Sequence, residues 1–227
     1  MGGPHRLRYQ ADLAALEGAV LGGIDLVVGQ VDRVLEAVQH QDIELASMVI
    51  ADDDRIDGRY LEVHQGILSL LATEAPVATD LRIVAALLHV IKHIERMGDQ
   101  CVNIAKLIPL SGHDPPTDEQ IIATLDRMGT LVRSQVAQSK QCFALRDAAL
   151  ADDLVRQDAE INRLNREIFA RAVEIGDDLD RREWAAYMML VARALERIGD
   201  NAVDIGEQTA FVVTGLFREF SDASHVS

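Results

Sequence analysis

The chain has 227 residues, of which 48% are hydrophobic and 4% aromatic, and its formal net charge is −15 at pH 7. The length fits one or two domains, and the few aromatic residues and five prolines disfavour an all-β fold. The acidic balance argues against binding of nucleic acid, which needs a basic surface. The longest run without a charged residue covers 11 positions, 63–73, which is too short for a membrane-spanning helix of about 20 residues.

The expected compartment is the cytoplasm. The first 25 residues carry five charged side chains, so they do not form the apolar stretch of a secretory signal. The two cysteines, Cys101 and Cys142, are too few for a disulfide framework and are expected to be small buried hydrophobic residues.

Apolar residues recur every three or four positions along the first half of the chain, as in amphipathic helices. The first such row runs from Leu13 to Val38, and the second runs from Ala46 to Leu71 and ends before Pro76. A third helix is expected to begin at Thr79 or Asp80, since either can cap a helix N-terminus, and to continue to about residue 108.

A break rich in proline separates the two halves. Residues 109–116 contain three prolines and a glycine, and the helical pattern then restarts. Further helices are predicted over 121–143, over 151–172 and from about 181 to about 217, with a capped turn at 176–180. We therefore predict an all-α fold of six long helices in two tandem three-helix bundles, at 5–110 and 115–220, with a frayed tail at 221–227.

An internal repeat supports this division. Residues 93–105 match residues 194–206 at six of thirteen positions, and the shared residues include a Glu-Arg-x-Gly-Asp motif. Residues 53–57 correspond to residues 158–162, with the first aspartate and the isoleucine in common. The pattern predicts two related three-helix units of about 110 residues rather than a long array of repeats.

In the third and the sixth predicted helix, carboxylates interrupt the row of apolar residues. In the third helix the row passes from Val84, Leu88 and Ile91 to Glu95 and Asp99. The sixth helix repeats this pattern with Glu196 and Asp200, and Asp204 extends its row by one turn, where the third helix has Asn103. Residues four apart share a helix face, and like charges on one face are unfavourable unless they are neutralised.

The preceding helix of each half carries a second acidic pair. Asp53 and Asp57 stand in the first half, and Asp158 and Asn162 stand in the second. Converging oxygen atoms of this kind suit a hard or borderline cation, although a solvated acidic face has the same spacing. The candidate metal ligands are Glu95, Asp99, Glu196, Asp200, Asp53, Asp57, Asp158 and Asp204.

Two glycines lie inside the motif helices. Gly98 and Gly199 each cost roughly 1 kcal/mol relative to alanine in a helix interior. Their equivalent positions indicate a close approach of neighbouring helices, and neutral tolerance of glycine is the alternative.

The residues show no catalytic constellation. There is no E-x-x-H motif of a di-iron bundle and no Walker-type phosphate loop. His89 and His93 lie four apart but lack the surrounding H-E-x-x-H pattern of a zinc protease. We predict that the chain is not an enzyme.

The motifs Glu95-Arg-Met-Gly-Asp99 and Glu196-Arg-Ile-Gly-Asp200, with the segment Ala75-Pro-Val-Ala-Thr-Asp-Leu-Arg82, resemble the PhoU family of phosphate-uptake regulators. The similarity covers nearly the whole chain. It implies two three-helix bundles that act as a negative regulator of the phosphate-starvation response. It further implies a homodimer that links the ATPase subunit of a phosphate ABC transporter to a membrane sensor histidine kinase.

The resemblance also implies a multinuclear metal cluster at the two acidic motifs, with iron as the first candidate and zinc, manganese or magnesium as others. Asn162 departs from the pattern, because it stands where the first half has Asp57. The alternatives are a metal-free helical adaptor with acidic docking faces and a metal-storing carboxylate bundle. We expect membrane association only through partners, because no lipidation signal or basic amphipathic helix is present.

Overall fold

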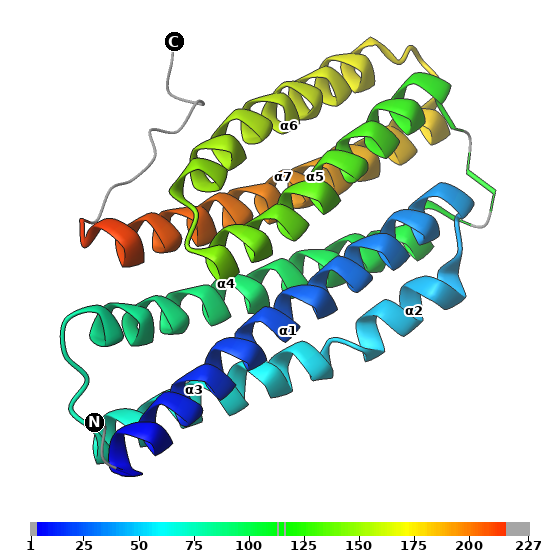
Figure 1. Ribbon diagram of the computed structural model, residues 1–227. Coiled ribbons are helices and arrows are strands. Elements are labelled where there is room, and N and C mark those ends of the chain that lie inside the picture. Colours follow the sequence, from blue (N-terminus) through cyan, green and yellow to red (C-terminus); the bar gives the residue numbers. More distant parts are fainter. Residues whose placement is uncertain (1–3, 113, 116, 217–227) are drawn as a thin grey trace.

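The computed structural model describes residues 4–112, 114–115 and 117–216, and the regular structure of these residues is entirely helical (Figure 1). The elements in chain order are α1 (Pro4–His40), α2 (Ile43–Ala51), α3 (Asp54–Thr73), α4 (Thr79–Leu107), the short 3₁₀ helix η1 (Ile108–Ser111), α5 (Glu119–Leu145), α6 (Ala148–Glu174) and α7 (Leu179–Thr214). The predicted all-α class is confirmed.

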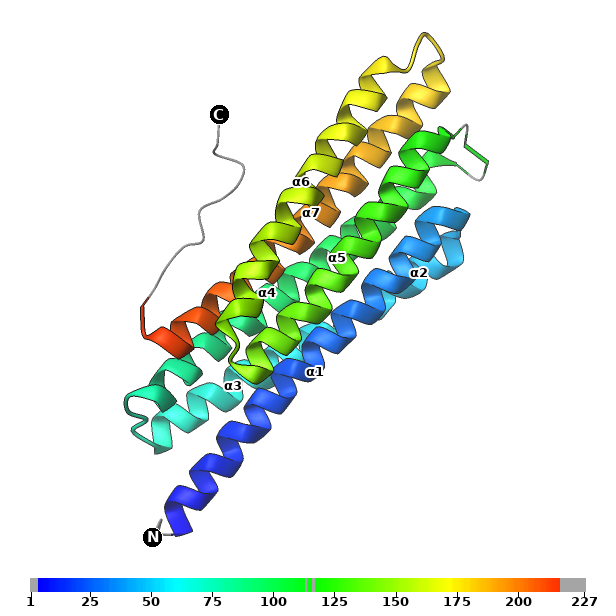
Figure 2. The same ribbon diagram turned by 45° about the horizontal axis from the view of Figure 1, so that its top comes forward.

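The helices form two three-helix units that lie side by side (Figures 1 and 2). The first unit contains α1, the pair α2–α3 and α4, and the second contains α5, α6 and α7. The six-helix arrangement is confirmed, but a turn at Asp52 and Asp53 divides the second predicted helix into α2 and α3. Its counterpart α6 is continuous.

The start of α4 at Thr79 agrees with the sequence prediction, although the expected side-chain cap is absent, and the end of α7 differs from the prediction. Helix α4 begins after Ala78, whose φ of 51° stops the chain from extending the helix backwards, and no side chain caps this end. Helix α7 ends at Thr214 rather than near 217, because Gly215 adopts a left-handed conformation with φ 75°. The predicted tail at 221–227 lies outside the described residues, and the domain limits 5–110 and 115–220 remain predictions.

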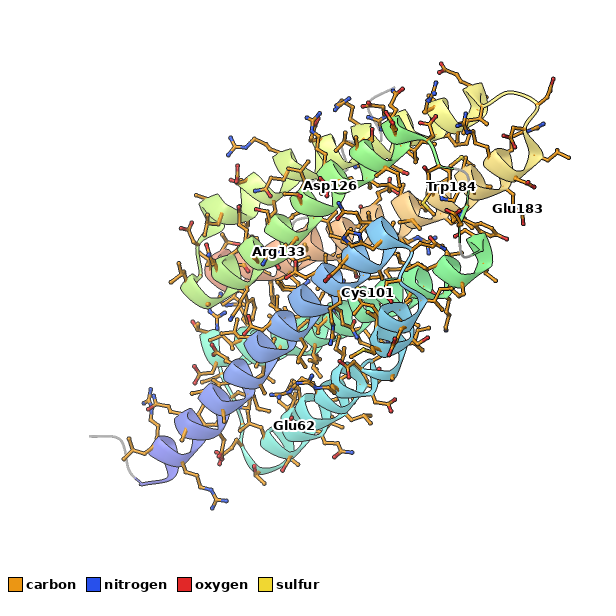
Figure 3. All side chains as sticks on the ribbon, turned by 90° about the vertical axis from the view of Figure 1, so that its right-hand side faces the viewer. Glu62, Cys101, Asp126, Arg133, Glu183 and Trp184 are labelled. Carbon is orange, nitrogen blue, oxygen red and sulfur yellow. The ribbon has the colours of Figure 1, made fainter. Side chains whose placement is uncertain are left out.

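One continuous hydrophobic core joins the two units. The units meet along two helix pairs, α1 with α5 and α4 with α7. At the α1–α5 contact, Gly129 leaves room for Leu35, since a Cβ there would lie within overlap distance of the leucine methyl groups. Three ion pairs bridge the same contact: Glu17–Arg146, Asp25–Lys140 and Asp32–Arg133, the last labelled at Arg133 in Figure 3.

Among the described helices, none combines the length and apolar character needed to cross a membrane.

Candidate functional site

In the first repeat, Asp53 at the N-cap of α3 lies against Gly98 of α4, in the segment that carries Glu95 and Asp99. Burial, and then the charges of Asp57, Asp99 and Glu95, raise the pKa of Asp53, although a hydrogen bond from Gln30 opposes the shift. Burial, and then the charges of Glu95 and Asp57, raise the pKa of Asp99 in the same way. Asp53 therefore lies near the acidic residues of α4, and the use of these carboxylates as metal ligands stays a prediction.

The inner side of this group is built around Gly98. A Cβ at this position would lie 2.9 Å from Asp53 Oδ1 and 3.0 Å from Ile56 Cδ1, so a larger residue would collide with the carboxylate. Gln30 Nε2 donates to the same Asp53 oxygen at 3.4 Å. The predicted close approach of neighbouring helices at Gly98 is confirmed. The absence of a side chain at Gly98 leaves room for the Asp53 carboxylate.

Gln30 is a residue that sequence reasoning missed. It is 1% exposed, and among the described residues its Oε1 atom has no hydrogen-bond partner. Gln135 has the same features in the second repeat, with its Oε1 also without a partner there. The signal was present in the sequence, because the two glutamines have the same separation along the chain as Asp53 and Asp158.

Asp53 occupies the N-cap position of α3 without using its side chain as a cap. Asp42, in contrast, accepts a hydrogen bond from the backbone N–H of Leu45 at the start of α2. The carboxylate oxygens of Asp53 therefore make no capping hydrogen bond at the start of α3. Across the gap, Glu95 accepts a hydrogen bond from Lys92 Nζ at 2.7 Å.

The second repeat reproduces the inner packing but not the outer charges. A Cβ at Gly199 would lie 2.8 Å from Gln135 Oε1 and 3.3 Å from Asp158 Oδ1. The other oxygen of Asp158 accepts a hydrogen bond from Asn162 Nδ2 at 2.7 Å. An amide that donates to Asp158 thus stands where the first repeat has a second carboxylate.

Glu196 and Asp200 differ in their surroundings. Glu196 is 9% exposed and accepts a hydrogen bond from Arg193 on the preceding turn of α7. Asp200 is exposed. Glu196 therefore lies on the buried side of α7, whereas Asp200 lies at its surface.

Asp204 lies elsewhere than the acidic row suggested. Its Oδ2 atom is 3.2 Å from Nδ1 of His93 on α4, and the same His93 nitrogen is 2.8 Å from Asn201 Oδ1. Burial lowers the pKa of His93 and raises that of Asp204. Asp204 therefore contributes to the α4–α7 contact between the repeats, and not to a carboxylate group facing α6.

The donor atoms of the first-repeat group suit a hard cation. They are carboxylate and amide oxygens, which magnesium, manganese and iron accept. Cys101 is buried in the interior (Figure 3), and burial, reinforced by the Asp53 charge, raises the pKa of its thiol. In the described part of the chain, no three His, Cys, Asp or Glu side chains are already arranged to hold a metal ion. The chemistry fits, and side-chain rotations would have to close the ligands on the ion.

Comparison with known proteins identifies the family. The PhoU domain matches residues 23–108 and 125–209, which are the two repeats. The chain belongs to the PhoU family. The resemblance inferred from the acidic motifs is thereby confirmed, and membership of this family of accessory proteins supports the prediction that the chain is not an enzyme.

Relatives of the chain match over nearly their full length. A phosphate-specific transport system accessory protein PhoU homolog of Clostridium acetobutylicum is 28% identical over 94% of this chain and 98% of its own. A homolog of the same name from Caulobacter vibrioides is 31% identical over 91% and 90%.

Solved structures of the family share the fold. The phosphate transport system regulatory protein PhoU of Streptococcus pneumoniae superimposes with a TM-score of 0.86 at 25% identity, covering 93% of this chain and 100% of the other. PhoU from Pseudomonas aeruginosa superimposes with a TM-score of 0.83 at 26% identity, covering 92% and 100%.

Proposed function

We propose that this chain is an accessory regulator of a phosphate-specific transport system and a negative regulator of the phosphate-starvation response. The observation that supports this most strongly is the match over both repeats to relatives that carry the name of such an accessory protein. In this role the protein transmits information between other proteins and performs no catalysis.

The expected partners are the ATPase subunit of a phosphate ABC transporter and a sensor histidine kinase. A net charge of −15 favours basic docking surfaces on these partners, because opposite potentials guide association. We further propose that the protein works in the cytoplasm as a homodimer and reaches the membrane only through its partners.

We also propose that a metal cluster, with iron as the first candidate and zinc, manganese or magnesium as others, binds at the acidic motifs. In the first repeat, Asp53, Asp57, Glu95 and Asp99 would hold it. A bound cation would offset the repulsion between these carboxylates and link the start of α3 to α4. Such a link stabilises the folded state increasingly, with the logarithm of the free metal concentration, once that concentration exceeds the dissociation constant.

A metal-free adaptor is the second candidate. It is favoured by the finding that no three ligand side chains of the described residues are already arranged around a metal position. A strong chelator separates the two, because only a metal-bound protein should lose thermal stability when the ion is removed. A metal-storing bundle would differ from both candidates, because it would take up many iron ions per chain.

The regulatory role is tested in the organism that encodes the chain. Deleting its gene should derepress a phosphate-starvation reporter in phosphate-rich medium, and the wild-type gene should restore repression. A reporter that stays repressed after deletion would contradict the proposed role. Copurification of the tagged protein with the transporter ATPase then tests the proposed partner.

A further inference from the structure

We propose that the pocket between η1, the linker that follows it and the start of α7 is a docking site for an arginine side chain of a partner protein. This linker pocket has a volume of about 250 Å³. The inference rests on the proposed function, in which the chain works by binding other proteins. The lining of the linker pocket includes Leu110, Asp114, Asp180, Glu183, Trp184 and Tyr187.

The first argument is the pattern of side chains on α7. Asp180, Glu183, Trp184 and Tyr187 recur at intervals of three and four residues, so they share one face of the first two helical turns. Figure 3 labels Glu183 and Trp184 on this part of α7. The face therefore brings two carboxylates and two aromatic rings to the linker pocket.

The two acids of this face are specific to the second repeat. When the repeats are aligned by their Glu-Arg-x-Gly-Asp motifs, Asp180 and Glu183 correspond to Thr79 and Arg82 at the start of α4. Arg82 lies against Gly215 at the end of α7. The architecture that the two repeats share therefore does not require acidic residues at these positions.

The second argument is charge. Asp114 of the linker adds a third carboxylate, and none of the described lining residues is basic. Asp114, Asp180 and Glu183 are all exposed, and none of them forms an ion pair with another described residue. Glu183 accepts a hydrogen bond from the Tyr187 hydroxyl at 3.2 Å, which uses one of its two oxygens. A cation is the ligand whose charge complements this pocket.

The third argument is the kind of cation. In the described part of the chain, no three acidic, His or Cys side chains are arranged to hold a metal ion. The guanidinium group of arginine suits the linker pocket better, because it forms paired hydrogen bonds with carboxylates and stacks on aromatic rings. Its apolar stem would pack on Leu110, which is 59% exposed. Pockets for whole small molecules span roughly 300–1,000 Å³, so the smaller linker pocket suits a single side chain.

The fourth argument is that the linker wall of the pocket is held in place by the first repeat. Gln41, in the turn between α1 and α2, donates from Nε2 to the carbonyl oxygens of Ile108 at 2.6 Å and Gly112 at 2.7 Å. Gly112 adopts a φ of 86°, which lets the chain turn directly after η1. A wall that is fixed in advance lowers the entropy cost of docking.

Trp184 provides a direct test, because it is the one tryptophan of the chain and lines the linker pocket. The full chain would be titrated with a blocked tripeptide that has a central arginine between two alanines, and with the neutral citrulline analogue of this peptide. Binding would be followed by tryptophan fluorescence and by calorimetry. We expect saturable binding of the arginine peptide alone, with an affinity that falls as the salt concentration rises.

A double variant assigns the binding to the pocket. Asp180→Asn combined with Glu183→Gln should weaken binding of the arginine peptide roughly five- to tenfold, because two ion pairs are lost. Glu62→Gln combined with Asp126→Asn is the matched control. It removes two charges at exposed residues of α3 and α5, outside the linker pocket (labelled in Figure 3), and should leave binding unchanged.

Three results would overturn the inference. They are equal binding of the arginine and citrulline peptides, unchanged binding by the double variant, and displacement of the arginine peptide by Mg²⁺, which would assign the pocket to a metal ion. The comparison of the two peptides uses the wild type alone, so it decides the question even if the double variant folds poorly.

The phosphate-starvation reporter separates this inference from the proposed function. In the deletion strain, we expect the wild-type gene to restore repression and the double variant to restore it less. Full repression by the double variant would overturn the inference and leave the regulatory role intact. A wild-type gene that fails to restore repression would instead overturn the regulatory role on which the inference rests.

Discussion

The missing side chain of Gly98 shows how one residue shapes the candidate site. Alanine is favoured over glycine in a helix by about 1 kcal/mol, but its Cβ would meet Asp53 Oδ1 at 2.9 Å and Ile56 Cδ1 at 3.0 Å. Because overpacking costs about 1–3 kcal/mol, we expect Gly98→Ala to lower the free energy of unfolding in urea by about 1–2 kcal/mol. Gly29→Ala is the control, since no atom lies within 4 Å of its added Cβ, and it should be neutral or stabilising. Equal effects of the two substitutions would contradict the packing described for Gly98.

Asp53 should make the stability of the metal-free protein depend on pH. Its pKa is raised in the folded state, chiefly by burial, so just above the ordinary value of about 3.9 the folded protein binds more protons than the unfolded chain. Stability from this residue is therefore present at low pH and falls as pH rises through the raised value. With a chelator present, we expect Asp53→Asn to raise the urea midpoint at pH 7 and to lose this advantage towards pH 4. An Asp126→Asn variant at an exposed position of α5 (Figure 3) controls for net charge, and a stabilisation by Asp53→Asn that is independent of pH would contradict the assignment.

At the scale of single elements, Asp118 joins the start of α5 to α6. It is 6% exposed, accepts a hydrogen bond from Ile121 N–H and pairs with Arg171 Nη2 at 2.8 Å. The hydrogen bond from Arg171 lowers the pKa of Asp118, so this contribution is present at neutral pH and is lost as pH falls through the lowered value. We expect Asp118→Ala to cost about 2 kcal/mol in urea unfolding at pH 7, as a cap and a buried ion pair are lost together.

Asp42→Ala is the matched control for this cap. Asp42 caps α2 through Leu45 N–H without a described ion pair, so its loss should cost about 1 kcal/mol. If Asp42→Ala proves as costly as Asp118→Ala at pH 7, the contact between Asp118 and Arg171 contributes no stability.

The break between α2 and α3 is an element that the apolar pattern concealed. The row of the second helix continues in register from Ile50 through Asp53 to Leu61, so periodicity alone predicts one helix. Three consecutive aspartates at 52–54 favour a turn, because their short side chains compete for backbone hydrogen bonds. Asp52 is also held by Arg33 of α1 at 2.5 Å, a contact across the bundle that a local pattern does not contain.

At the scale of the whole molecule, the continuous core predicts that the repeats unfold together. Trp184 is the one tryptophan of the chain, is 3% exposed and lies in the second repeat (Figure 3). Its fluorescence therefore reports on that repeat, while far-ultraviolet circular dichroism reports on all helices. We expect the two signals to give coincident thermal transitions, and separate midpoints would show that the repeats unfold as independent units.

The sequence predicts some features of the fold and of the acidic group but not others. The helices and the opposition of the α3 and α4 carboxylates follow from local periodicity and from the internal repeat. The contact of Asp204 with His93 does not follow, because it depends on how α4 packs against α7 across the two repeats. The shared spacing of Gln30 and Gln135 marks them as equivalent in the two repeats, but only the fold shows that Gln30 lies beside Asp53.

The most direct test of the account is the anomalous scattering of crystals of this protein grown with Mn²⁺. Metal binding at the acidic motifs predicts anomalous density among Asp53, Asp57, Glu95 and Asp99. A map without density there would contradict the proposed metal site and favour the metal-free adaptor.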